Sequence, residues 1–106
     1  AGDVAEYEGR IYGIWPPSLA QGRTAGKVMS GKNTKFEGYV PSHKLKVAGI
    51  NVVSLGELNE EKHYEEEILE DNENYVKVIK NKGEKIGALI VGNYNEQNKL
   101  IADIKR

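Results

Sequence analysis

The spacing of apolar and polar positions predicts a first helix over about residues 15–30. The segment opens with Trp15-Pro16-Pro17-Ser18, and proline suits a first helical turn because its missing N–H would have no intrahelical partner there. Gly31 stands where a helix commonly ends on a left-handed residue. Residues 1–14 are broken too often by glycine to predict a regular element.

A polar break at residues 31–35 is followed by a different periodicity. Leu45 and Val47, and then the apolar positions from Ile50 to Leu55, predict two short strands around Gly49. Three further strands are expected, joined by short turns rich in Asn and Gly, which is typical of an antiparallel meander. These strands are predicted over residues 66–70, 75–80 and 85–91.

The chain closes on a predicted amphipathic helix from about Asn95. Leu100, Ile101 and Ile104 recur at helical spacing, and Lys105 and Arg106 stand in the last turn. A helix of this kind would cover one face of the sheet. The sequence therefore predicts an α+β fold, with helices at both ends and antiparallel strands between them.

Composition excludes several classes of protein. The 106 residues carry a net charge of −1, whereas nucleic-acid binding needs a clustered basic excess, so we expect no nucleic-acid partner. No apolar run approaches the roughly 20 residues of a membrane span, and the first residues do not resemble a secretory signal. With no cysteine, disulfides and Cys-ligated metals are excluded, and we expect a cytoplasmic location and no membrane partner.

The ionisable side chains suggest no catalytic group and no metal site. His43 and His63 lack a nucleophile elbow and a paired metal-ligand spacing, so each is interpreted as a solvated histidine. Residues 57–73 form an acidic stretch. Two interpretations of it stay open: a solvated edge, or a docking site for a basic partner.

The N-terminal segment has the features of a ligand-binding wall. Gly2-Asp3 offers a carboxylate after a small residue, and the helix that starts at Pro16 offers unpaired N–H groups and positive potential toward an anionic oxygen. Gly22 and Gly26 share one helical face with Leu19 and Met29, which suggests close approach of another backbone or a flat ligand. The alternative is a frayed terminus beside a core helix.

Three blocks of sequence, in this order, resemble the pyridine nucleotide-dependent FAD oxidoreductases. The first block is similar to their second flavin-binding motif, the second to the helix after it, and the third to their C-terminal, or interface, domain. The match is closest to NADH:rubredoxin reductases, NADH oxidases and the FAD-containing part of NAD(P)H nitrite reductases. The blocks are Ala1-Gly2-Asp3-Val4-Ala5-Glu6; then Gly13-Ile14-Trp15-Pro16, Gln21-Gly22, Ala25-Gly26 and Met29-x-Gly31; then Leu45-Lys46-Val47-x-Gly49-Ile50, Ser54-x-Gly56-Glu57 and Ile86-Gly87-Ala88-x-x-Val91-Gly92.

The resemblance implies that residues 1–34 are the remnant of a FAD-binding domain and that residues 35–106 are an interface domain. It implies cofactor-binding residues Gly2, Asp3, Ile14, Trp15 and Pro16. Asp3 would bind the ribityl and pyrophosphate region of FAD, and the backbone of Ile14 and Trp15, with the helix that starts at Pro16, would approach the pyrimidine edge of the flavin. No catalytic residue is implied.

The resemblance also implies that the chain is a fragment of a larger enzyme. It lacks the G-x-G-x-x-G motif of the two nucleotide-binding domains that precede this segment in the family, so we expect the fragment alone to bind no FAD and to be inactive. The intact protein would transfer electrons from NAD(P)H through FAD to a redox protein or a small acceptor.

The expected partners are the N-terminal FAD and NAD(P)H domains of the parent chain, with a redox-protein acceptor or a homodimer as further candidates. The acceptor, the choice of NADH or NADPH and the oligomeric state stay open. The alternative function is a free-standing protein-interaction module with no enzymatic role.

Overall fold

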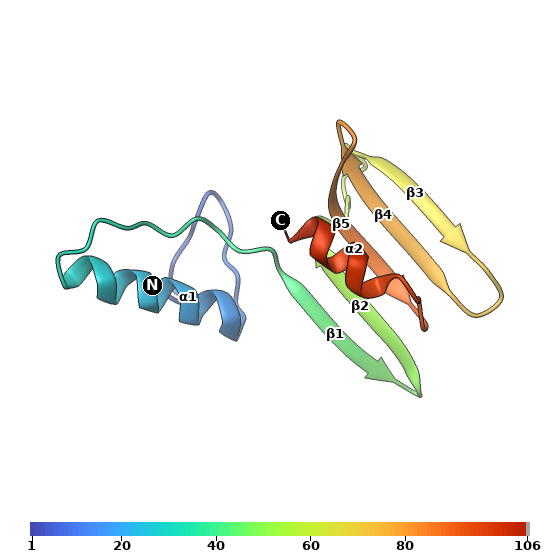
Figure 1. Cartoon of the computed structure of the whole chain (residues 1–106), viewed down its shortest axis with the longest axis horizontal. Helices are drawn as coiled ribbons and strands as arrows, with labels where there is room; N and C mark the ends of the chain where they lie inside the picture. Colours follow the sequence, from blue (N-terminus) through green and yellow to red (C-terminus); the bar gives the residue numbers. More distant parts are fainter. Residues whose placement is uncertain (106) are drawn as a thin grey trace. The chain divides into compact units, whose positions relative to one another are not determined.

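The computed structural model describes residues 1–105, in two compact units. The first unit covers residues 1–41 and contains α1 (Trp15–Met29), and the second begins at Ser42 and contains a sheet and α2 (Gln97–Ile104) (Figure 1). Two helices and a five-stranded antiparallel sheet confirm the predicted α+β class. The strands are β1 (Ser42–Val47), β2 (Ile50–Gly56), β3 (Glu65–Glu70), β4 (Tyr75–Asn81) and β5 (Glu84–Val91).

Helix α1 ends where the sequence predicts it to end. Gly31 has a φ of +85°, and its N–H donates to the Val28 carbonyl oxygen at 2.9 Å. The Lys32 N–H donates to the Lys27 carbonyl oxygen at 3.0 Å. This pair of hydrogen bonds is a Schellman motif, which satisfies two of the last carbonyls of the helix and turns the chain back along it (Figure 1).

The sheet has the strand order β1-β2-β5-β4-β3, with every neighbouring pair antiparallel. The meander predicted over β3, β4 and β5 is confirmed. The β1–β2 hairpin turns at Ala48-Gly49 and the β4–β5 hairpin at Lys82-Gly83; both residues of each turn have positive φ, as in the turns that match strand twist. The pairing of β2 with β5 joins the two hairpins into one sheet.

The main core lies between the sheet and α2, which lies across one sheet face (Figure 1). Register places most of the buried strand residues on that face, namely Val53, Leu55, Val76, Val78, Ala88 and Ile90, whereas Ile79, which pairs with Gly87, is buried on the opposite face. Leu100 and Ile104 of α2 are buried with them. An ion pair between the Lys85 Nζ and an Asp103 carboxylate oxygen at 2.9 Å connects β5 to α2, and this hydrogen bond raises the pKa of the Lys85 ammonium.

The opposite face is covered only in part. The chain after β2 crosses close to Gly87, where a Cβ would come within 1.7 Å of the Glu57 carbonyl oxygen. The Glu57 N–H donates to the Ile86 carbonyl oxygen at 3.1 Å, and the Lys77 Nζ lies 3.2 Å from the Leu58 carbonyl oxygen, so this loop lies over β5 and β4. Only a residue without a side chain fits at position 87.

On the β1–β2 hairpin, three apolar side chains of that face stay exposed. Leu45, Val47 and Ile50 share the face of the β1–β2 hairpin that points away from α2, and each has more than half of its surface accessible. Their neighbours on the core-facing side of β1 are Lys44 and Lys46. The hairpin therefore alternates basic and apolar positions, with the apolar ones outside the core.

Candidate functional site

The N-terminal residues are held against the first turns of α1. The Gly2 N–H donates to the Gln21 side-chain oxygen at 2.7 Å, and Gln21 is buried. The Ser18 hydroxyl donates to an Asp3 carboxylate oxygen at 2.6 Å and lies 3.1 Å from the Ile14 carbonyl oxygen. A turn closed by the Ala5 N–H on the Gly2 carbonyl oxygen, at 2.9 Å, completes the arrangement. This terminus is therefore ordered on the helix, against the expectation for a frayed end.

No side chain caps the N-terminus of α1, so its backbone N–H group is left to a ligand or to water. Ile14 is the N-cap residue, in an extended conformation with a φ of −136°, and no acidic residue stands in the first turn. Pro16 and Pro17 carry no N–H, so Trp15 supplies the first-turn backbone donor, which has no partner within a helix. The positive end of the helix dipole strengthens the attraction of the Trp15 N–H for a carbonyl or anionic oxygen.

This donor and acceptor set fits the part of FAD that the resemblance assigns to it. Asp3 is exposed, and a carboxylate that accepts one hydrogen bond from Ser18 retains capacity to accept another from a ligand hydroxyl. Ser18 belongs to the first turns of α1, so the carboxylate is tied to the same end of the helix as the Trp15 N–H. A ligand with hydroxyls on one part and a ring carbonyl on another, as in FAD, matches both groups.

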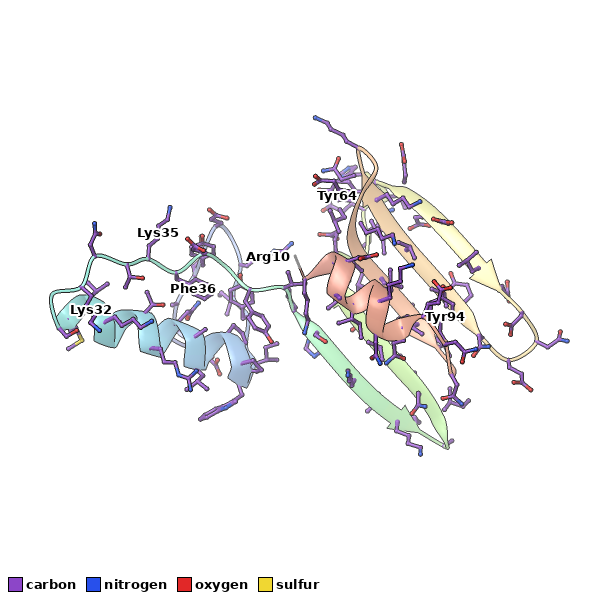
Figure 2. All side chains as sticks on the ribbon, in the orientation of Figure 1. Arg10, Lys32, Lys35, Phe36, Tyr64 and Tyr94 are labelled. Atoms are coloured by element: carbon purple, nitrogen blue, oxygen red, sulfur yellow. The ribbon has the colours of Figure 1, made fainter. Side chains whose placement is uncertain are left out.

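Four aromatic rings hold the loop between Asp3 and α1. The Tyr7 and Tyr12 rings each contact the Phe36 ring edge-on, with centroids 4.9 and 6.1 Å apart, and Tyr12 contacts the Tyr39 ring in the same way at 6.3 Å. The Tyr39 N–H donates to the Tyr12 hydroxyl oxygen at 3.1 Å. Partial burial, with the Glu8 carboxylate nearby, raises the pKa of the Tyr7 phenol. We call Tyr7, Tyr12, Phe36 and Tyr39 the aromatic cluster; Phe36 is labelled in Figure 2.

One face of α1 is exposed along its whole length. Trp15 is 76% and Met29 88% exposed, and Leu19 between them is also exposed. An added Cβ at Gly22 or Gly26 would meet no atom within 4 Å. The helix buries Pro17 and Gln21 on its other side, so the face that carries Gly22 and Gly26 is open.

The acidic stretch forms the β3 edge of the sheet and the loop before it. Glu66 pairs with Lys77 at 3.4 Å, and Glu67 pairs with Lys80. A hydrogen bond from Asn59 lowers the pKa of the Glu66 carboxyl, and a hydrogen bond from Lys80 lowers that of Glu67. Lysines of β4 thus partly neutralise the edge.

Neither histidine belongs to a cluster of metal-ligating side chains among residues 1–105. His43 is exposed on β1, and the His63 Nδ1 lies 3.3 Å from a Glu61 carboxylate oxygen in the loop before β3. Residues 1–105 contain no group of three or more His, Cys, Asp or Glu side chains arranged to hold a metal ion. Over the same residues, neither helix has the length and hydrophobicity needed to cross a membrane.

Ser18 and Gln21 belong to the candidate site, although their residue types alone do not mark them. Ser18 is a common residue of a first helical turn, and Gln21 is a polar residue in the middle of a helix. Their role depends on the N-terminal chain folding back across α1, a contact between residues 15 to 19 positions apart.

Known proteins are similar to this chain over most of its length. It is 33% identical over 108 residues to a nitrite reductase [NAD(P)H] of Bacillus subtilis (strain 168), a match that covers 99% of this chain. It is 36% identical over 61 residues, 58% of this chain, to an NADH-rubredoxin oxidoreductase of Clostridium acetobutylicum. The crystal structure of NADH:rubredoxin oxidoreductase from Clostridium acetobutylicum superposes with a TM-score of 0.70 and 27% identity over 97% of this chain.

These relatives are much longer. The chain covers 13% of the nitrite reductase, 16% of the NADH-rubredoxin oxidoreductase and 27% of the chain in the crystal structure. The family model of the rubredoxin NAD+ reductase C-terminal domain matches residues 41–106, which comprise the whole second unit and the residue before it. The chain therefore belongs to the rubredoxin NAD+ reductase C-terminal domain family.

Proposed function

We propose that this chain is the C-terminal part of a flavoprotein oxidoreductase that transfers electrons from NAD(P)H through FAD to a redox protein or a small acceptor. In this proposal, residues 1–34 are the last part of the FAD-binding domain and residues 35–106 are the interface domain. The N-terminal FAD and NAD(P)H domains of the parent chain are the direct partners, and they pack on the exposed glycine face of α1.

One observation carries the proposal: Gly2 and Asp3 are tied to the N-terminal turns of α1 by Gln21 and Ser18. The Asp3 carboxylate accepts hydrogen bonds from ligand hydroxyls, and Ser18 fixes its orientation. The Trp15 N–H, at a helix end without a side-chain cap, donates to a ring carbonyl and favours negative charge there. FAD, when bound, supplies the hydride-accepting and electron-carrying chemistry.

The same geometry explains why the chain alone is expected to be inert. Asp3 and the start of α1 form one wall, and the phosphate cradle that dominates dinucleotide affinity needs a glycine-rich turn absent from residues 1–106. The proposal is tested by adding FAD to the purified 106-residue chain and to the full product of its gene. Flavin retained on gel filtration by the full product alone supports it. Stoichiometric FAD binding by the short chain, or no flavin on the full product, contradicts it.

A free-standing interaction module is the second candidate, and the exposed apolar side chains of the β1–β2 hairpin favour it. Leu45, Val47 and Ile50 form a surface of the kind that partners cover. The reading frame upstream of Ala1 separates the two candidates. A continuous frame that contains G-x-G-x-x-G supports the flavoprotein, whereas a start codon directly before Ala1 supports the module.

A further inference from the structure

We propose that the aromatic cluster positions the flavin-facing backbone, with Tyr12 as the central positioning residue. The inference rests on the proposed function and adds a role for residues that neither the family match at 41–106 nor the predicted site includes. It concerns the three residues between Tyr12 and the first proline of α1: Gly13, Ile14 and Trp15.

Gly13, Ile14 and Trp15 connect Tyr12 to the two prolines of α1. On the C-terminal side of this segment, Pro16 and Pro17 fix φ in the first helical turn, and Pro17 is buried. The segment begins with Gly13, which has a φ of +62°. Because glycine has no side chain, the backbone at this position can adopt many conformations. The Ile14 carbonyl oxygen, and with it the peptide group of the Trp15 N–H, is held by Ser18. Without an anchor immediately before Gly13, the preceding Gly13–Ile14 peptide would not have one preferred direction.

Tyr12 supplies that anchor. Its ring lies edge-on against both Phe36 and Tyr39, and its hydroxyl oxygen accepts the Tyr39 N–H at 3.1 Å. Edge-to-face pairs prefer one relative orientation, so two of them and a hydrogen bond together define where the Tyr12 side chain lies. The cluster therefore restricts the chain on the side where glycine would otherwise leave it free.

The rest of the cluster holds the anchor in place. The Tyr7 N–H donates to the Arg10 carbonyl oxygen at 2.9 Å and the Arg10 N–H returns to the Tyr7 carbonyl oxygen at 3.0 Å, which closes a tight hairpin turn at Glu8-Gly9. This turn sets Tyr7 against Phe36. Gly38, at a φ of +88°, passes so close that an added Cβ would lie 3.4 Å from the Tyr7 ring.

The cluster also joins the two ends of the first unit. Phe36, labelled in Figure 2, and Tyr39 belong to the segment that follows α1. Tyr7 and Tyr12 belong to the loop between Asp3 and α1. The segment after α1 is thus a second support of the flavin-facing backbone, beside the helix itself.

The test uses the full product of the gene with the variants Tyr12→Phe and Phe36→Leu. Tyr12→Phe removes one hydroxyl and keeps the ring, and we expect the FAD dissociation constant to rise by up to about tenfold, the factor that corresponds to one hydrogen bond. Phe36→Leu removes two ring contacts and should have the larger effect. Tyr64→Phe, which makes the same chemical change in the second unit, is the matched control and should bind FAD as the wild type does.

Two further readouts separate positioning from general stability. The visible circular dichroism of the bound flavin should change in both cluster variants, and the flavin midpoint potential should fall because the helix N-terminus no longer lies in its best alignment with the ring carbonyl. Variants that lose thermal stability but keep the wild-type dissociation constant, circular dichroism and potential would overturn the inference. Wild-type protein that binds no FAD would contradict the proposed function as well, whereas unchanged variants of a flavin-binding wild type contradict the cluster alone.

Discussion

Replacing Gly87 by alanine should destabilise the second unit strongly, because the chain after β2 crosses directly over this residue. An added Cβ would lie 1.7 Å from the Glu57 carbonyl oxygen and 2.6 Å from the Glu57 carbonyl carbon and nitrogen, whereas ordinary contact begins at 3.4 Å. These are backbone atoms, so no side-chain rotation relieves the overlap. The Glu57 N–H bond to the Ile86 carbonyl oxygen, at 3.1 Å, would be displaced with them.

The expected loss adds an overpacking term of about 1–3 kcal/mol to a hydrogen-bond term of about 1 kcal/mol, or about 3 kcal/mol in all. For a domain of this size each kcal/mol moves the melting temperature by about 4–8 °C, so the midpoint should fall by about 12–24 °C. Thermal and urea unfolding followed by far-UV circular dichroism measure the change.

Gly49→Ala is the matched control for Gly87→Ala. Gly49 has a φ of +80° and no atom within 4 Å of an added Cβ, so the control carries only the conformational cost of about 1–2 kcal/mol for a left-handed residue. If Gly87→Ala unfolded no earlier than Gly49→Ala, the close crossing of Glu57 over β5 would be wrong.

Two other changes have predicted signs. In the 106-residue chain, Gly22→Ala should stabilise α1 by about 1 kcal/mol, because the added Cβ meets nothing within 4 Å and alanine favours the helix. Urea unfolding of this chain, followed by Trp15 fluorescence, measures the change, and a lower urea midpoint for the variant would contradict the open face. The Asp71 carboxyl has its pKa lowered from 3.8 by the Glu73 and Asn74 N–H groups, so its contribution to stability is present above pH 3.8 and is lost as the pH falls below it. In Asp71→Asn, the free energy of unfolding should therefore fall less steeply with decreasing pH in the acid range than in the wild type. An equally steep fall in the variant would contradict this.

Most of the fold could be predicted from the sequence because its signals are local. Single residue types indicate both ends of α1, the start at Trp15-Pro16-Pro17 and the end at Gly31. The strands predicted over residues 66–70, 75–80 and 85–91 lie within one residue of the observed bounds, whereas β1 begins three residues before Leu45. The pairing of β2 with β5 could not be predicted in the same way, since it joins residues more than 30 positions apart and leaves no short-range pattern. Gly56 and Gly87 pair with each other where β2 meets β5, but nothing in the sequence distinguishes them from the other ten glycines.

The candidate site could be predicted in part. Gly2-Asp3 and the proline-initiated helix were indicated by residue types that suit an anionic ligand and by the resemblance; their mutual geometry was not. That geometry depends on Gln21 and Ser18 and on rings that meet across more than 20 residues, such as Tyr12 and Phe36. Contacts of this kind require the folded chain, because neither periodicity nor spacing encodes them.

The flavin content of the full gene product, with and without Asp3→Ala, tests the central claim most directly. We expect FAD to be bound to the wild type at one per chain, and the dissociation constant to be raised by about 10- to 100-fold in Asp3→Ala, the range for a hydrogen bond to a charged group. A wild-type product without flavin, or a variant that holds FAD as tightly as the wild type does, would contradict it.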